Sequence, residues 1–181
     1  EAPTPGFYRS QSLLENAEQL RERMGDEPFF AALGGTDSNC GWGALAEMAC
    51  TEFDASITGV TLSTEQLAFA KGRMARFNVT ERADLRLQDY RDIDDAPFDA
   101  ICSIEMVEAV GRGYWPTYFA TLAKLLKPGG KACVQSIVID DALFERYVHS
   151  TDFIQQYIFP GGCLPCPREF RAQAEAAGLD V

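Results

Sequence analysis

The sequence predicts an α/β fold: an open, doubly wound, mostly parallel sheet with helices on both faces. Apolar, β-branched segments alternate with segments of helical spacing from about residue 31 onward. The apolar run 98–104 is continuous, which is typical of a parallel strand covered on both faces, and 131–139 is expected to be another buried strand. At 181 residues the chain is long enough for one domain with a sizeable core. We therefore expect a helical lead-in over residues 1–30 and one domain over residues 31–181.

Local sequence signals indicate where the individual elements begin and end. Residues 10–24 have apolar positions at helical spacing, and a second helix follows the turn CGWG at residues 40–43. Ser63 is a natural N-cap, and Gln66 three positions later completes a capping box, so another helix begins there. Further helices are expected at 114–126, before the breaker KPGG, and at 167–178. Strands are expected at 55–62, 83–90, 98–104 and 131–139, with a last one beginning at 179–181.

Composition excludes several classes of protein. The formal net charge of −11 opposes general binding to a phosphate backbone, so no nucleic acid partner is expected. No window approaches the length of apolar sequence that spans a membrane, and the first ten residues lack the regions of a secretory signal. The six cysteines are expected to be reduced, with Cys102 and Cys133 acting as small hydrophobes in core strands. CLPC (163–166) and the single His149 form no ligand motif, so no metal site is expected.

In sheets of this kind, ligands bind beyond the carboxyl ends of the strands, near the point where strand order reverses. The CGWG turn allows close approach of the backbone to a ligand at a helix N-terminus, although glycine-rich turns also occur for purely geometric reasons. The dinucleotide fingerprint G-x-G-x-x-G is absent from residues 39–44. The second strand ends in Thr61-Leu62-Ser63 and not in an acid, which argues against ordinary NAD binding.

Acidic residues follow two of the other expected strands. Asp89 and Tyr90 can hold the amino group and the face of an adenine, or they belong to a solvated loop. Glu105 and Glu108 lie three positions apart in a largely apolar stretch after a buried strand. Carboxylates in such settings are costly unless they are paired or used, although either can be an exposed acid at a helix start. Glu108 is the stronger candidate for a functional role.

Seven segments occur in the same order as in the cyclopropane-fatty-acyl-phospholipid synthase family: CGWG, GVTLSTEQ, LQDYRD, SIEMVEAVG, LKPGG, VQSI and DFIQQYIFPGGCLP. The chain resembles this family from about Asp37 to Val181. The resemblance implies the class I (Rossmann-like) fold of S-adenosylmethionine-dependent methyltransferases, incomplete at the C-terminus relative to the family. It also implies transfer of a methyl or methylene group to the double bond of unsaturated phospholipid acyl chains. Trp42 would be a family signature beside the methionine end of the cofactor.

The resemblance implies a role for each candidate site residue. The residues that would bind S-adenosylmethionine are Asp37, Asn39, Gly41, Gly43, Thr61, Leu62, Gln66, Asp89 and Tyr90. The catalytic residues, gathered around a bicarbonate ion that acts as base, would be Glu108, Gln135 and Ile137. The residues that would shape the acyl-chain channel are Tyr157, Phe159 and Gly161. Gln135 stands where many members of the family have histidine.

The implied chemistry has a physical logic. The π electrons of a double bond attack the sulfonium methyl group, which leaves a carbocation that loses a proton and closes to a ring. A preorganised negative site and a positioned base are therefore needed. The implied partner is an unsaturated acyl chain at a membrane surface, met by a cytoplasmic, bacterial protein at the inner face of the membrane. YWPTYF (114–119) is one candidate for the membrane entrance and a buried aromatic helix face is the alternative; a homodimer is left open.

Departures from the family pattern keep two other functions open. Asn39 replaces a glycine, and the first strand, AALGGT, is a poor one, as expected of an inactive cofactor-fold domain that binds a partner. A methyltransferase acting on a soluble small molecule is the other alternative. If the turn holds the methionyl group, Gly43→Val is expected to abolish cofactor binding and to leave the fold largely intact.

Overall fold

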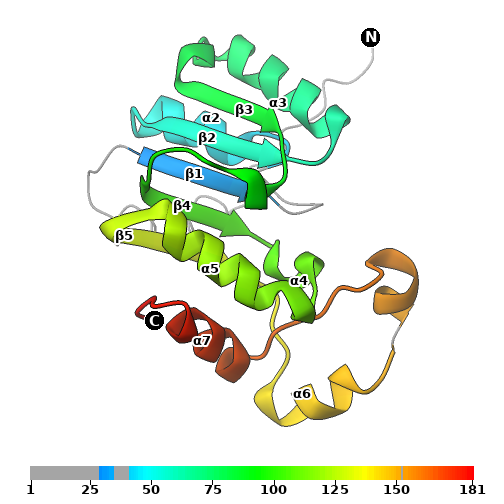
Figure 1. Ribbon diagram of the computed structural model, residues 1–181. Helices are drawn as coiled ribbons and strands as arrows, with labels where there is room; N and C mark the ends of the chain where they lie inside the picture. The colour runs from blue at the N-terminus through cyan, green and yellow to red at the C-terminus, as the bar shows by residue number, and fades with distance from the viewer. Residues whose placement is uncertain (1–28, 35–40, 152) are drawn as a thin grey trace.

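The structure is a computed structural model that describes residues 29–34, 41–151 and 153–181 (Figure 1). Within these residues, one sheet of parallel strands has the order β3-β2-β1-β4-β5, so strand order reverses between β1 and β4. The strands are β1 (Phe29–Gly34), β2 (Ser56–Thr61), β3 (Ala83–Leu87), β4 (Phe98–Ile104) and β5 (Leu126–Gln135). This is the open, doubly wound parallel sheet that the sequence predicts.

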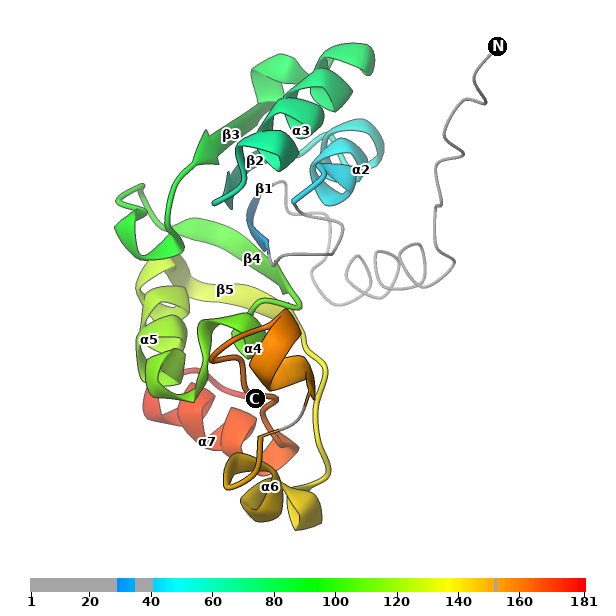
Figure 2. The ribbon, with the colours of Figure 1, turned by 90° about the vertical axis from the view of Figure 1, so that its right-hand side faces the viewer.

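Helices cover both faces of the sheet, as Figures 1 and 2 show. On one face, α2 (Ala44–Glu52) and α3 (Thr64–Arg76) pack on β2 and β3. On the other, α5 (Trp115–Leu125) packs on β5, and α7 (Pro167–Ala176) packs on α5. The shorter elements are α4 (Val107–Val110), α6 (Asp141–Val148), three 3₁₀ turns (Thr80–Arg82, Tyr90–Asp92, Arg112–Tyr114) and a π-helical turn (Ile154–Ile158).

Each face of the sheet has its own hydrophobic core. On the α2–α3 face the core consists mainly of small and aliphatic side chains, including Ile57, Ala70 and Met74. On the α5 face the core is aromatic, and Trp115 is fully buried against Phe144 with ring centroids 6.3 Å apart. The Trp115 indole N–H donates to the carbonyl of Val107 at 3.1 Å, which attaches α5 to α4. The aromatic core therefore fixes α4, the helix that carries Glu108.

The sequence prediction was wrong about β5. A buried strand was expected at 131–139, but β5 ends at Gln135 and is the edge strand of the described sheet. An edge strand has a neighbour on one side only, so Lys131 and Ala132 are exposed. No strand is formed at 179–181, and β3 ends at Leu87, short of the expected 90. The helix expected at 10–24 lies outside the described residues.

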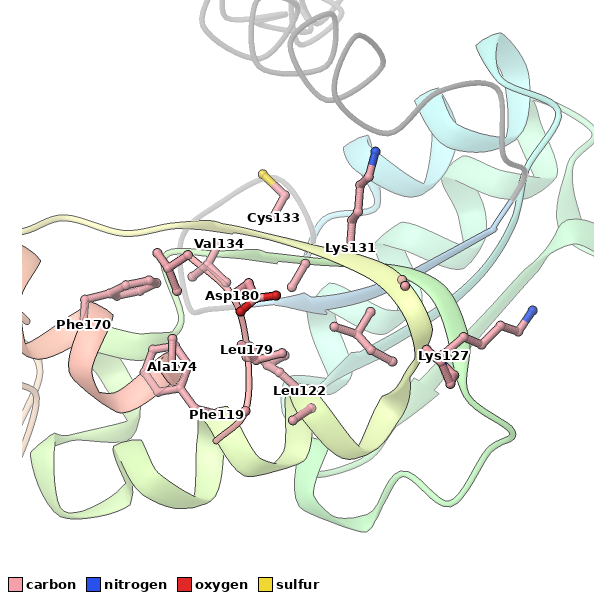
Figure 3. Close-up of a pocket in the computed structure, with 18 of the residues that line it drawn as sticks. Phe119, Leu122, Lys127, Lys131, Cys133, Val134, Phe170, Ala174, Leu179 and Asp180 are labelled. Carbon is pink, nitrogen blue, oxygen red and sulfur yellow. The ribbon is translucent and has the colours of Figure 1, made fainter. Parts of the chain in front are cut away.

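A cavity of about 1020 Å³ runs along β5, between this strand and helices α5 and α7 (Figure 3). Apolar side chains such as Leu122, Val134 and Phe170 line it. Gln135 is the one predicted site residue in its lining. The cavity therefore lies beside the face of the sheet, away from most of the predicted strand-end residues.

Three further observations concern membrane-spanning helices, metal sites and the cysteines. In the described ranges, no helix combines the length and the apolar character needed to cross a membrane. No group of three His, Cys, Asp or Glu side chains that could hold a metal ion is found in that part of the chain. The five cysteines placed by the structure form no disulfide, and Cys102 and Cys133 are paired in register on β4 and β5. The sixth, Cys40, lies outside the described residues.

Candidate functional site at the carboxyl ends of the strands

The glycine turn before α2 is tightly packed against α3. A Cβ atom added to Gly41 would lie 2.6 Å from Oε1 of Gln66, and one added to Gly43 would lie 2.9 Å from Cβ of Ala70. Gly43 also has a φ of +79°, which side-chain-bearing residues rarely adopt. Trp42 between them is 40% exposed and meets Phe69 edge-on at 5.3 Å. The expectation that Gly43→Val leaves the fold intact is therefore wrong, because α3 occupies the space of the new side chain.

The end of β2 forms a neutral hydrogen-bonded corner behind this turn. The Ser63 hydroxyl caps α3 by accepting from the Gln66 amide at 3.2 Å, as the capping box predicts. The Gln66 side chain does not complete the box; its Oε1 accepts from the Thr61 hydroxyl at 2.7 Å, while the Ser63 amide donates to Thr61 Oγ1 at 3.2 Å. Gln66 is buried, whereas Leu62 is 76% exposed. The structure thus brings Gly41, Thr61 and Gln66 together and leaves the Leu62 side chain in solvent.

Specific side-chain contacts hold the loop after β3. Both carboxylate oxygens of Asp89 accept from the Arg91 guanidinium, at 2.9 and 2.6 Å, and the Arg91 guanidinium holds the pKa of Asp89 below its usual value. Tyr90 is a buried core residue whose ring meets that of Tyr118 at 6.0 Å. The Tyr90 ring is therefore a core contact in this structure, and Asp89 already has a cationic partner. Their predicted place beside an adenine stays a prediction.

Glu108 lies on α4, directly after β4. Its Oε1 accepts from the backbone amide of Ile137, while its Oε2 is buried and has no hydrogen-bond partner in the described part of the chain. Burial raises the pKa of Glu108, the Ile137 amide and the Ser136 hydroxyl oppose the shift, and the nearby carboxylate of Glu105 adds to it. One oxygen of this acid is therefore fixed and the other is uncommitted.

Glu105 and Gln135 join Glu108 at the same end of the sheet. The Glu105 amide donates to the Gln135 carbonyl at 2.8 Å, and Gln135 Nε2 donates to Glu105 Oε1 at 3.0 Å. Glu105 has a φ of +47°, a backbone conformation that is unfavourable for a residue with a side chain and is often found at functional sites. Glu105 was absent from the set of expected catalytic residues; its spacing from Glu108 was the one sequence signal for it.

Ile137 and the residues expected to line the channel lie at the surface. Ile137 has a 54% exposed side chain, and its amide is used by Glu108. Tyr157 is 64% exposed, Gly161 is exposed and Phe159 is half-buried. Just after these three residues in the sequence, the Cys163 amide donates a hydrogen bond to the Glu108 carbonyl at 2.9 Å. The predicted channel residues therefore adjoin α4 and include exposed positions.

Two roles were expected for the segment 114–119: a membrane entrance or a buried aromatic helix face. Trp115, Tyr118 and Phe119 are buried in the core on the α5 face of the sheet, and Tyr114 is exposed. The Tyr118 hydroxyl donates to Ser103 at 2.7 Å within that core. The segment is a buried aromatic helix face and not a membrane entrance.

A parallel sheet of this order, with polar residues gathered at its carboxyl ends, defines a class I methyltransferase fold, and solved structures agree. The cyclopropane synthase MmaA2 from Mycobacterium tuberculosis superimposes with a TM-score of 0.72 at 24% identity, over 95% of this chain and 64% of that one. The mycolic acid cyclopropane synthase CmaA1, solved with SAH and CTAB, gives a TM-score of 0.74 at 24% identity, over 97% of this chain and 65% of that one. The predicted fold class is confirmed.

The sequence comparisons identify the family. The family described as mycolic acid cyclopropane synthetase matches residues 31–181, and the chain belongs to it. Tuberculostearic acid methyltransferase UfaA1 of Mycobacterium tuberculosis is 43% identical over 69% of this chain and 29% of its own length. Cyclopropane-fatty-acyl-phospholipid synthase of Escherichia coli is 36% identical over 93% of this chain and 42% of its own length. The predicted resemblance is confirmed, and the chain spans less than half the length of these two relatives.

Proposed function

We propose that this chain carries the cofactor-binding and catalytic core of an S-adenosylmethionine-dependent enzyme that transfers a methyl or methylene group to the double bond of an unsaturated phospholipid acyl chain. The observation that supports this proposal best is the position of Glu108: a half-buried acid on α4, just after β4, with one oxygen held and the other, Oε2, buried and uncommitted. Membership of the family and the names of the relatives agree with the proposal.

The residues at the turn and at the end of β2 fit the cofactor. S-adenosylmethionine, when bound, supplies an electrophilic methyl group on a sulfonium. Gly41 leaves no room for a side chain beside Gln66, so the turn lies close to the Thr61–Gln66 corner. The Thr61 and Gln66 side chains are neutral, and they suit the hydroxyl groups of a ribose better than a phosphate. Asp37 and Asn39 belong to the proposed set as well, although they lie outside the residues that the structure describes.

Glu108 is suited to the two electrostatic tasks of the reaction. Addition of a methyl group to a double bond leaves a positive charge on carbon, which a buried carboxylate stabilises more strongly than an exposed one. Because burial raises the pKa of Glu108, the group also accepts a proton more readily than an ordinary glutamate. Oε2 is the atom left for that proton.

The same atom fits the bicarbonate ion that the family resemblance implies. Bicarbonate has a hydroxyl group of its own, which can donate a hydrogen bond to the uncommitted Oε2 of the Glu108 carboxylate. Gln135 is held beside this site by Glu105 and offers an amide where many family members have histidine. The Ile137 amide is already used by Glu108, so it is not a free donor to the ion in this structure.

Two measurements on the purified chain test the proposal. Calorimetry with S-adenosylmethionine should show saturable binding, and mass spectrometry of acyl chains should show a gain of one CH₂ group per double bond with unsaturated phospholipid only. Absence of binding at millimolar cofactor would leave the inactive, partner-binding alternative. Cofactor binding together with methylation of soluble acceptors, and none of lipid, would favour the small-molecule alternative.

Gln66→Ala is expected to weaken S-adenosylmethionine binding about threefold to tenfold, since a neutral hydrogen bond contributes about 0.5–1.5 kcal/mol net. Thr61 contributes in the same way because its hydroxyl belongs to the same corner. Lys71→Ala, at an exposed position of the same helix, is the control and should leave the affinity unchanged. A loss beyond a hundredfold would show that Gln66 mainly holds the structure of the turn.

A further inference from the structure

The segment Phe153–Ile158 presents large apolar side chains to solvent. Phe153 is 65% exposed, Ile154 50%, Tyr157 64% and Ile158 50%. The rings of Phe153 and Tyr157 contact each other with centroids 5.2 Å apart, so two aromatic side chains form one surface. Contiguous exposed apolar surface of this kind marks an interaction site far more often than single exposed residues do.

The charge of the segment limits what kind of surface it fits. Residues 153–162 (FIQQYIFPGG) contain no charged residue in a chain of which 24% is charged and whose formal net charge is −11. Aromatic and isoleucine side chains without charge are typical of segments that enter the boundary between lipid head groups and acyl chains. Without cations of its own, the segment gains nothing from anionic lipid. A zwitterionic lipid surface is therefore the partner whose chemistry matches.

The segment also continues directly into the candidate catalytic site. Gly161 packs on α4 so closely that a Cβ added to Gly111 would lie 2.6 Å from the Gly161 carbonyl oxygen. The Cys163 amide then donates to the carbonyl of Glu108 at 2.9 Å. Figure 1 shows the segment, in orange, out beyond α4 on the side toward which the strands point. A bilayer that meets this segment has its acyl chains next to the helix that carries Glu108.

We infer that Phe153, Ile154, Tyr157 and Ile158 form the surface through which this protein docks on a zwitterionic phospholipid bilayer, placing acyl chains next to α4. The inference rests on the proposed function, because it assigns the route by which that substrate arrives. Docking by apolar insertion has a recognisable signature: binding to vesicles is insensitive to salt and is not strengthened by anionic lipid.

Flotation with dioleoylphosphatidylcholine vesicles tests the inference, without cofactor and at low and high salt. The chain should float under both conditions, and Phe153→Ser/Tyr157→Ser should lower its partitioning at least about tenfold, since each ring loses its burial in lipid. Phe77→Ser/Leu87→Ser is the matched control, because these side chains are also exposed but lie at the α3–β3 end of the molecule. The control should float like the parent chain.

Other occupants of the surface give different results, and each would overturn the inference. Equal flotation of parent chain and Phe153→Ser/Tyr157→Ser would remove the segment from the membrane contact. A parent chain that floats only with anionic lipid would assign binding to another surface. A dimeric parent that does not float, and that becomes monomeric on Phe153→Ser/Tyr157→Ser, would make the segment an interface between two copies. Turnover on detergent-dispersed unsaturated phospholipid tests the proposed function separately, since it needs no docking.

Discussion

Replacement of Glu108 by glutamine is expected to lower turnover on unsaturated phospholipid about 10²–10³-fold, the usual effect of removing one preorganised electrostatic group. Glutamine keeps the size of the side chain and can still accept from the Ile137 amide, but it carries no charge and cannot take up a proton at the uncommitted oxygen. Affinity for S-adenosylmethionine should change little, because the residues proposed to bind it lie at the ends of other strands. Turnover and calorimetric affinity, measured on the same preparations, check both expectations.

The same substitution has an opposite expected effect on stability. Burial raises the pKa of Glu108 in the folded chain, so the folded state binds a proton more readily than the unfolded state. This group therefore contributes stability that is fully present below the ordinary glutamate pKa and is lost as pH rises through the raised value. Glutamine does not titrate, so Glu108→Gln has no such loss. The free energy of unfolding of the variant minus that of the parent chain should therefore increase from acidic to neutral pH.

Glu145→Gln is the matched control, because Glu145 is an exposed glutamate on α6. It should change neither turnover nor the pH dependence of unfolding. Unchanged turnover in Glu108→Gln, together with cofactor affinity equal to that of the parent chain, would return α4 to a purely structural role. Loss of both turnover and cofactor binding would instead point to a disturbed fold.

Local sequence signals predicted the elements that depend on few neighbours. The apolar run 98–104 coincides with β4, and Ser63 caps α3 as expected. The glycine turn leads into α2 because a left-handed residue such as Gly43 can reverse the chain there. The parallel arrangement of the strands followed from the alternation of strands and helices, since parallel strands need crossover connections.

The contacts that define the candidate site join residues far apart in sequence and were beyond local signals. Glu108 meets the Ile137 amide across 29 positions, and Glu105 meets Gln135 across 30. The pairing of β4 with β5 creates both contacts, and the periodicity of apolar residues does not indicate which strands are neighbours. Tyr90 shows the limit of strand-end signals: its position predicted a ring beside an adenine or in a solvated loop, and the structure buries the ring against Tyr118. The uncommitted oxygen of Glu108 likewise emerges only from the packed structure.

Gly43→Ala is expected to destabilise the fold by about 2–5 kcal/mol, through two separate costs. A side chain at a φ of +79° costs about 1–2 kcal/mol, and the new Cβ meets Ala70 at 2.9 Å, where overpacking costs about 1–3 kcal/mol. Gly72→Ala, on α3, is the matched control: nothing lies within 4 Å of its new Cβ, and alanine favours a helix over glycine by about 1 kcal/mol. The control should therefore be slightly more stable than the parent chain.

A double-mutant cycle separates the two costs of Gly43→Ala. Ala70→Gly removes the nearest atom that the new Cβ meets, at 2.9 Å, but keeps the Ala70 Cα at 3.1 Å and the backbone conformation of Gly43, so it relieves part of the overpacking and none of the strain. Gly43→Ala/Ala70→Gly should thus be less destabilised than the sum of the single variants, by an amount that measures the contact between the turn and α3. Urea denaturation of the four proteins gives these free energies. Strict additivity would mean that the Ala70 methyl group does not constrain the turn.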